Sequence, residues 1–192
     1  VRSGTSVRIS HIFFDLHGTL VDSARLSACY AEQVGSVMAE RFGGKAEVWA
    51  EANRLIVADW DSYFADLDFD DDDCLADLWE GQVRVTRALF RITGEREPDL
   101  SSLTALAREL PYLAARGCDA FYPDSKVVLE RLHQAGFILG IATHVISPLA
   151  RGMLAGAGVL NLFAGLLLCP DVTERFRKDA AFYRAARIPV EY

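Results

Sequence analysis

The sequence predicts an α/β fold in which a parallel sheet is interrupted by a large helical insertion. Two short apolar runs that suit buried strands, residues 9–14 and 137–142, flank a long segment with apolar residues at helical spacing. After this segment strands and helices alternate, a pattern typical of parallel sheets covered on both faces. At 192 residues, the chain exceeds one typical domain of about 150 residues and falls short of two. One core domain with an insertion fits this length best.

The first strand is expected over residues 9–14, a run rich in β-branched and aromatic residues. It ends sharply at the turn-prone segment 15–19, which reads Asp-Leu-His-Gly-Thr. Gly18 would let the chain turn tightly and bring backbone N–H donors toward an anion. The end of this strand is therefore a candidate binding loop.

The insertion, residues 20–118, is expected to be a helical bundle without strands. Breaks at Gly43, around Asp70 and at residues 94–98 divide it into about four amphipathic helices. We interpret residues 66–73 as a solvated connection and not as a calcium loop, because the glycine that such a loop needs is missing. The apolar positions at helical spacing are Tyr30, Val34, Val37, Met38, Trp49, Ala52, Leu55, Ile56, Leu75, Leu78, Trp79, Leu103, Leu106, Ala107 and Leu110.

The remainder of the chain alternates helices and strands. A helix is expected to begin at Pro123 and to stop at Gly136, followed by a strand over residues 137–142. A helix over residues 148–155, a third strand over 166–169 and a last helix over 178–187 complete the pattern, and the sheet should therefore be parallel.

Charge and composition limit the partners. Apolar residues make up 51% and charged residues 24%, which excludes a disordered or fibrous chain. Twenty Lys and Arg residues against 27 Asp and Glu residues give a net charge of −7, which disfavours nucleic acid and anionic membranes. We therefore expect a small-molecule substrate.

The cysteines and the apolar stretches suggest a cytoplasmic protein. Cys29, Cys74, Cys118 and Cys169 are far apart and form no metal-binding motif, so we expect reduced thiols and no zinc site. The longest apolar stretch, residues 153–169, is interrupted by glycines and is a poor candidate for a membrane span. The N-terminus shows no apolar targeting segment.

Two candidate functional residues follow the first two predicted strands. Asp15 comes directly after the first strand and Thr143 directly after the second. In open parallel sheets ligands bind beyond the carboxyl ends of the strands. A carboxylate exposed there can act as a nucleophile or as a cation ligand.

The residues around Asp15 resemble a known motif. The run Ile12-Phe-Phe-Asp-Leu-His-Gly-Thr-Leu-Val-Asp-Ser23 resembles the first motif of the haloacid dehalogenase-like hydrolase superfamily, a strand ending in Asp-x-Asp-Gly-Thr-Leu-x-Asp-Ser. Residues 138–143 resemble the second motif, and Arg177-Lys178 stand where the third supplies its lysine.

The resemblance extends to the domain organisation. Residues 122–136 resemble the helix that returns from an inserted cap in the subfamily containing phosphoglycolate phosphatase, β-phosphoglucomutase and haloacid dehalogenase. The resemblance implies a Rossmann-like three-layer core formed by residues 1–19 and 119–192, with an all-helical cap at residues 20–118.

The resemblance also implies roles for individual residues. Asp15 would be the nucleophile, Thr143 would hydrogen-bond the transferred phosphoryl group and Lys178 would neutralise charge on both. Mg²⁺ would be held by Asp15 and His17, the latter through its backbone carbonyl. The residues expected to touch the substrate are Gly18, Thr19, His144 and Arg177.

The cap also carries several aromatic residues. Most of them should belong to the core of the cap, and one or two should face the substrate. They are Trp49, Trp60, Tyr63, Phe64 and Trp79.

Three departures from the family pattern leave alternatives open. His17 stands where phosphatases carry an acid/base Asp, dehalogenases Tyr and phosphonate hydrolases Ala; an imidazole could serve, or the site could be repurposed. Lys178 is preferred as the third-motif residue, but Arg177 lies six residues before Tyr183, as the family spacing requires. The last strand and the acidic fourth motif would follow Tyr192, so we expect this chain to lack them.

The expected function is hydrolysis of a small phosphate monoester through an aspartyl-phosphate on Asp15. One alternative is a carbon–halogen hydrolase that uses Asp15 without a metal, with Arg41 or Arg54 as its cap arginine. The other is a catalytically impaired member that binds a ligand or a partner protein. A monomer and a homodimer are both compatible with the sequence.

Overall fold

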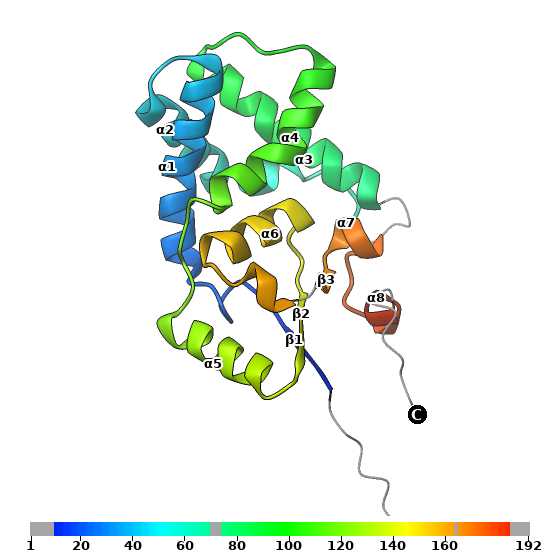
Figure 1. The fold of residues 1–192 in the computed structure, drawn as a ribbon. Helices are drawn as coiled ribbons and strands as arrows, with labels where there is room; N and C mark the ends of the chain where they lie inside the picture. The colour runs from blue at the N-terminus through cyan, green and yellow to red at the C-terminus, as the bar shows by residue number, and fades with distance from the viewer. Residues whose placement is uncertain (1–9, 70–73, 164, 185–192) are drawn as a thin grey trace, which may run out of the picture.

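The computed structural model describes residues 10–69, 74–163 and 165–184. Strands β1 (His11–Phe14), β2 (Ile138–Ala142) and β3 (Leu167–Leu168) form a parallel sheet in the order β1-β2-β3 (Figure 1). Phe14 pairs with Ile141 and Ala142 pairs with Leu168, so the three strands end at one edge. The predicted α/β class with a parallel sheet is confirmed.

Helices cover both faces of the sheet. Successive side chains of β2 point to opposite faces, so apolar residues on each face need a covering layer. Leu139 and Ile141 are buried in one cluster with residues of α5 (Pro123–Gln134) and α6 (Ser147–Gly156). On the opposite face Ala142 and Leu168 pack against Phe182 of α8 (Ala180–Arg184), with Phe13 partly buried beside them. These three layers are the predicted core architecture.

The insertion folds into the helices α1 (Ser23–Phe42), α2 (Ala46–Ala58), α3 (Cys74–Thr93) and α4 (Leu100–Ala115), with a short 3₁₀ turn, η1 (Trp60–Tyr63), after α2. Carboxylates begin two of them: Asp22 accepts the N–H groups of Ala24 and Arg25 at α1, and Asp99 caps α4. The bundle buries its own apolar cluster, which includes Trp49, Phe90 and Leu103. Leu55, predicted to be core, is 51% exposed, because it lies on the solvent side of α2.

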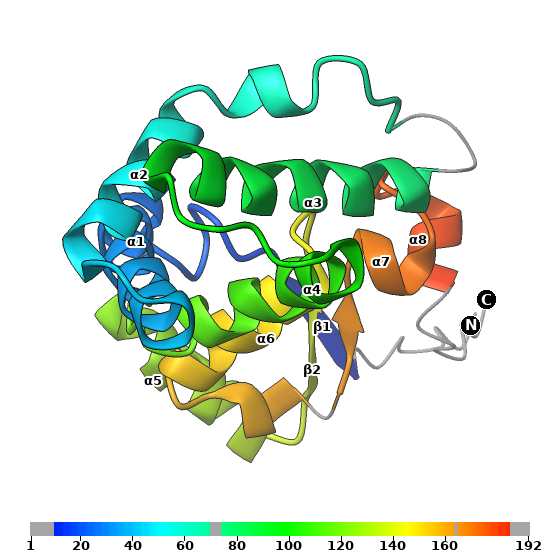
Figure 2. The ribbon, with the colours of Figure 1, turned by 90° about the horizontal axis from the view of Figure 1, so that it is seen from above.

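The cap rests on the core through two helices that approach closely. Helix α4 packs across α6, as the view in Figure 2 shows. A Cβ at Gly152 of α6 would lie 2.7 Å from the Ala115 side chain and 2.8 Å from the Tyr112 carbonyl oxygen. Only glycine fits at this crossing, so Gly152 allows α4 of the cap to approach α6 of the core this closely.

The remaining elements differ in detail from those expected. The third strand is shorter than residues 166–169, and η2 (Leu160–Phe163) and α7 (Pro170–Thr173) flank it. The last helix begins at Ala180 and not at Lys178, because the Asp179 carboxylate accepts the N–H groups of Ala181 and Phe182 and caps it. Residues 70–73 and the predicted helical residues 185–187 lie outside the described residues.

A disulfide joins Cys29 of α1 to Cys118, which follows the last cap helix. The expectation of four reduced thiols is therefore wrong for this pair, whereas Cys74 and Cys169 are buried and take no part in this disulfide. The two partners are 89 residues apart, and only the return of the chain after α4 brings them together. Disulfides are rare in the reducing cytosol, so the cross-link counts against the cytoplasmic location expected from the sequence.

Candidate active site

The carboxyl ends of β1 and β2 bring together the residues expected to carry the chemistry. Asp15 follows β1 and Thr143 follows β2, and Thr143 is buried. The Lys178 ammonium donates to Asp15 Oδ2 at 2.8 Å, and the Leu16 N–H donates to Asp15 Oδ1 at 2.8 Å. The Asp15 side chain remains 43% exposed, so one carboxylate is both paired and reachable.

The surroundings of Asp15 keep it ionised. Burial by itself would raise its pKa. The Lys178 hydrogen bond, the Leu16 N–H, the Lys178 charge and the Thr143 hydroxyl together outweigh that effect and hold the pKa below its ordinary value. At neutral pH Asp15 is therefore a carboxylate, the form that can attack an electrophile.

Lys178 is the basic residue that contacts Asp15. It lies in the loop between α7 and α8, where Glu174 in the left-handed conformation (φ 55°) turns the chain. Its side chain is only 20% exposed, whereas Arg177 is an exposed residue. The structure thus gives Lys178 the position that the sequence left open between the two.

The loop after Asp15 is a tight turn. Gly18 has a φ of 71°, which favours glycine, and its N–H donates to the Val21 carbonyl oxygen. The Thr19 N–H donates to the Leu16 carbonyl oxygen. These two N–H groups, expected to face the substrate, are hydrogen-bonded within the turn.

Two histidines stand beside the carboxylate. His17 hydrogen-bonds with Ser23 at 3.1 Å through Nδ1, and the His144 ring stacks on Phe176 with centroids 5.2 Å apart. Desolvation lowers the pKa of His17, although the Asp15 charge acts in the opposite direction. Desolvation and the Lys178 charge lower the pKa of His144, again against Asp15. Both imidazoles are therefore neutral at pH 7.

A cavity of about 520 Å³ opens between the cap and this edge of the sheet. His17 and His144 line it on the core side, so it reaches the neighbourhood of Asp15. Its lining is mostly apolar and aromatic, and no Lys or Arg is among the described residues that form it. The lining residues from the cap include Leu26, Tyr30, Asn53, Val57, Trp60, Asp61, Phe64, Phe69, Leu78, Gln82, Val85 and Pro111.

The aromatic residues divide between cap core and cavity. Trp49 is fully buried, and Trp79 is half-buried under the Arg108 guanidinium, 4.3 Å from the ring centroid. Trp60 and Phe64 line the cavity, while Tyr63 packs against the cap cluster. Phe69 and Phe176 also line it, and sequence reasoning missed both. The sequence signal that could have found both residues is that each is an aromatic residue within a polar segment that lacks helical spacing.

The described residues do not make the expected magnesium site. No three His, Cys, Asp or Glu side chains gather closely enough to hold a metal within residues 10–69, 74–163 and 165–184. Both oxygens of Asp15 already accept hydrogen bonds, from the Leu16 N–H and from Lys178. Mg²⁺ prefers an octahedron of oxygen ligands, which one carboxylate does not supply. Magnesium therefore remains a prediction from the resemblance.

The two cap arginines considered for a dehalogenase do not line the cavity. Arg41 forms a bidentate pair with Glu109 at 2.7 and 3.0 Å, and Arg54 pairs with Glu32 and Glu51. Both arginine side chains are substantially exposed. Neither is placed to bind a substrate carboxylate in this cavity.

The family follows from the site and from comparison with known proteins. A strand that ends in a paired, ionised Asp under a helical cap is what the motif resemblance implied, and the model of the haloacid dehalogenase-like hydrolase family matches residues 9–188. The chain belongs to the haloacid dehalogenase-like hydrolases. The family and the capped α/β fold expected from the sequence are thereby confirmed.

A solved structure of a HAD-hydrolase shares the fold. A HAD-hydrolase from Bacillus subtilis, YfnB bound to magnesium, is 16% identical with a TM-score of 0.54, over 96% of this chain and 75% of that one. An L-2-haloacid dehalogenase from Xanthobacter autotrophicus with covalently bound chloropropionic acid is 19% identical with a TM-score of 0.48, over 92% and 63%. At 16% identity the YfnB match shows the fold alone, and nothing is concluded from the dehalogenase match.

The chain spans less than two thirds of the length of the Xanthobacter dehalogenase. The comparison with curated proteins gave no match. Within the described residues, no helix combines the length and the apolar character needed to cross a bilayer.

Proposed function

We propose that this hydrolase cleaves a phosphate monoester through a covalent intermediate on Asp15. The supporting observation is the Lys178 ammonium, 2.8 Å from the Asp15 carboxylate. A carboxylate and a phosphoryl group are both anions and repel each other unless a cation stands between them. A cation fixed on the nucleophile is the arrangement that phosphoryl transfer requires, because that reaction depends on positioning and on charge compensation.

In the first step an Asp15 oxygen attacks phosphorus and the ester P–O bond breaks, so that the bonding pair leaves with the substrate oxygen. Lys178 offsets the charge that gathers on the phosphoryl oxygens. The buried Thr143 hydroxyl, which also interacts with Asp15, donates to the same group. The leaving oxygen takes a proton from solvent, because the neutral imidazole of His17, which lines the cavity, has no acidic proton to give.

In the second step water attacks phosphorus, the bond between the phosphoryl group and Asp15 breaks, and the carboxylate is restored. A base takes the proton of the water. The candidate is the neutral imidazole of His17, which lies two residues after Asp15. The products are the free hydroxyl compound and inorganic phosphate. Magnesium is given no part in either step.

A second candidate is hydrolysis of a carbon–halogen bond by the same carboxylate. The apolar lining of the cavity favours it, because a neutral haloalkyl group is more readily desolvated than a phosphate dianion. Asp15 would attack carbon, halide would leave with the bonding pair, and water would then cleave the resulting ester at its carboxyl carbon. The exposed positions of Arg41 and Arg54 speak against a halogenated acid as substrate.

Hydrolysis of 4-nitrophenyl phosphate, with and without Mg²⁺, tests the proposal, and halide release from 2-chloropropionate tests the second candidate. The Asp15→Asn variant should abolish either reaction. Asp119→Asn is the matched control, because Asp119 forms an ion pair with Lys126 elsewhere on the core. Phosphate release that persists in Asp15→Asn would refute the proposal. Turnover of neither compound by the wild type would favour a member that only binds a ligand or partner.

A further inference from the structure

We propose that the cavity binds the non-reacting part of the substrate as an uncharged aromatic group carrying a hydrogen-bonding substituent, which makes the substrate an aryl phosphate. This inference rests on the proposed function for its reacting group. The aromatic group of the substrate is inferred from the residues that line the cavity. Three features of the lining carry it: a row of aromatic rings, an amide that is open to the cavity, and the absence of Lys and Arg among the described lining residues.

The wall is a row of five rings that runs from the cap to the active site. Trp60 stacks on Phe64 with centroids 4.8 Å apart, and Phe64 meets Phe69 at 6.0 Å. Phe69 stacks on Phe176 at 5.1 Å across the junction between cap and core. Phe176 stacks on His144 at 5.2 Å. All five residues line the cavity, so a flat ring that enters it can pack against aromatic surface.

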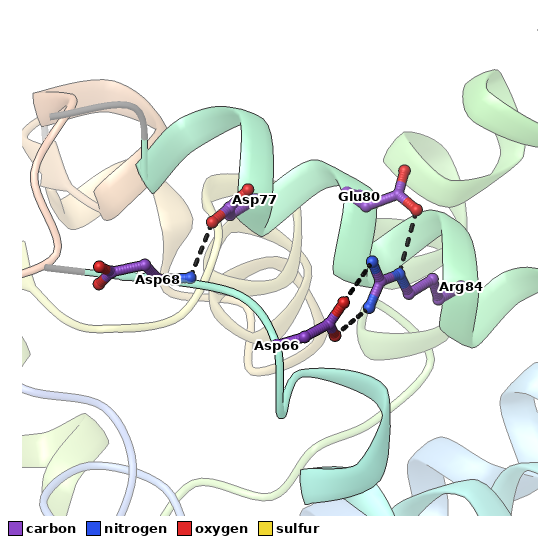
Figure 3. A network of polar contacts seen from close by, with 5 residues as sticks. All are labelled: Asp66, Asp68, Asp77, Glu80 and Arg84. Atoms are coloured by element: carbon purple, nitrogen blue, oxygen red, sulfur yellow. Dashed lines mark hydrogen bonds and ion pairs between the residues drawn. The ribbon is translucent and has the colours of Figure 1, made fainter. Parts of the chain in front are cut away.

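The cap half of the wall is held on α3 by polar contacts (Figure 3). The Arg84 guanidinium donates to both oxygens of Asp66 at 2.5 and 3.2 Å and to Glu80 at 3.0 Å. The Asp68 N–H donates to the Asp77 carboxylate at 2.8 Å. The segment that carries Trp60, Phe64 and Phe69 is thus tied to a helix at two points beyond the 3₁₀ turn.

A glycine adds a packing constraint on the same wall. The Phe64 ring lies directly against Gly81 of α3, where any Cβ would overlap the ring. The ring can occupy this place only because residue 81 has no side chain. The wall is therefore formed before a ligand arrives, which reduces the ordering cost of binding.

A buried amide that lines the same cavity offers a polar contact. Asn53 of α2 is only 6% exposed and lines the cavity. Its side chain has no hydrogen-bond partner in the described part of the chain, yet none of its polar atoms is sealed from solvent. The amide is therefore open to the cavity, where a ligand hydroxyl or carbonyl group can replace solvent as its hydrogen-bond partner. Gln82 of α3 lines the same space.

The charge of the lining selects against a second ionised group on the substrate, besides the reacting phosphate. Among the described residues that line the cavity none is Lys or Arg, and Asp61 is an acid. A second phosphate or a carboxylate on the substrate would therefore be buried without a cation, which is strongly unfavourable. A volume of about 520 Å³ lies within the range of small-molecule sites, about 300–1,000 Å³.

Equilibrium binding of 2-naphthol, measured by titration calorimetry, tests the inference without turnover. The wild type should bind it, and Trp60→Ala, a change at a 41% exposed residue that folding should tolerate, should weaken binding about 2- to 10-fold. Asn53→Leu should weaken binding of 2-naphthol but not of naphthalene, which lacks the hydroxyl. Leu55→Ala, on the exposed side of the same helix, is the control and should bind as the wild type does.

Hydrolysis rates separate this inference from the proposed function. We expect kcat/KM for 2-naphthyl phosphate to exceed that for glycerol 3-phosphate. If 2-naphthol binds as expected but no phosphate ester is cleaved, the proposed function fails and the assignment of the cavity stands. If phosphate esters are cleaved but the folded wild type does not bind 2-naphthol, or Trp60→Ala and Asn53→Leu bind it equally well, the aromatic assignment is overturned.

Discussion

Removing the charge of Lys178 should disable the nucleophile without unfolding the protein. In Lys178→Met the ammonium that lies 2.8 Å from Asp15 is lost. Unit charges at that distance attract by about 1.5 kcal/mol in water and by about 6 kcal/mol at a dielectric constant of 20. Because the Asp15 side chain is 43% exposed, screening favours the lower value.

The kinetic effect should exceed this ground-state effect, because Lys178 also faces the transferred group. Loss of one preorganised donor typically lowers the rate by about 10²–10³-fold, and screening places the expected loss in kcat/KM near 100-fold. Lys178→Met should also raise the Asp15 pKa, so the acidic limb of the pH–rate profile should move to higher pH. Lys178→Arg should recover part of the rate, since the charge is kept but the geometry changes.

Steady-state kinetics with an aryl phosphate from pH 4 to pH 9 measure both effects. The matched control is Lys126→Met, which removes an equally close ion pair, 2.6 Å from Asp119, outside the site. This control should leave the rate and the pH profile unchanged. A Lys178→Met enzyme with the wild-type rate and the wild-type acidic limb would refute the role given to Lys178.

Three further predictions concern stability. Replacing Cys29 and Cys118 by Ser should lower the free energy of unfolding by up to about 4–5 kcal/mol, worked from a separation of 89 residues, and calorimetry with and without reductant checks it; equal unfolding temperatures would contradict the disulfide. Gly152→Val should destabilise the chain by about 1–3 kcal/mol in urea unfolding, because the side chain would enter α4, whereas an unchanged midpoint would contradict the close crossing. Because the Asp15 pKa is depressed on folding, Asp15 contributes stability above its unfolded pKa that is lost as pH falls through its folded pKa; Asp15→Asn should therefore flatten acid unfolding below about pH 4, and acid unfolding identical to that of the wild type would contradict the shift.

Much of the site could be predicted because its residues follow strands or conform to a local motif. Asp15 and Thr143 end neighbouring parallel strands, and that adjacency alone places them at one edge. Lys178 was harder, since its position depends on where a helix begins. Asp179 caps α8 and leaves Lys178 in the preceding loop, a detail that spacing from Tyr183 did not reveal.

The features that the sequence did not predict depend on contacts between distant segments. Phe69 and Phe176 form one wall only after the cap folds over the core. The pairing of Cys29 with Cys118 likewise requires the return of the chain after α4. Leu55 follows the helical pattern of its neighbours and is nevertheless exposed, because periodicity identifies a helix more reliably than the limits of its buried face.

The most direct test of the account is to identify the residue that becomes covalently modified during turnover. The enzyme is mixed with 2-naphthyl phosphate, quenched in acid within a single turnover and reduced with borohydride, which converts an aspartyl phosphate to homoserine. Peptide mass spectrometry should then find homoserine at position 15 in the wild type and no modification in Asp15→Asn. Phosphate release by the wild type with a phosphorylated residue other than Asp15 would contradict the central claim.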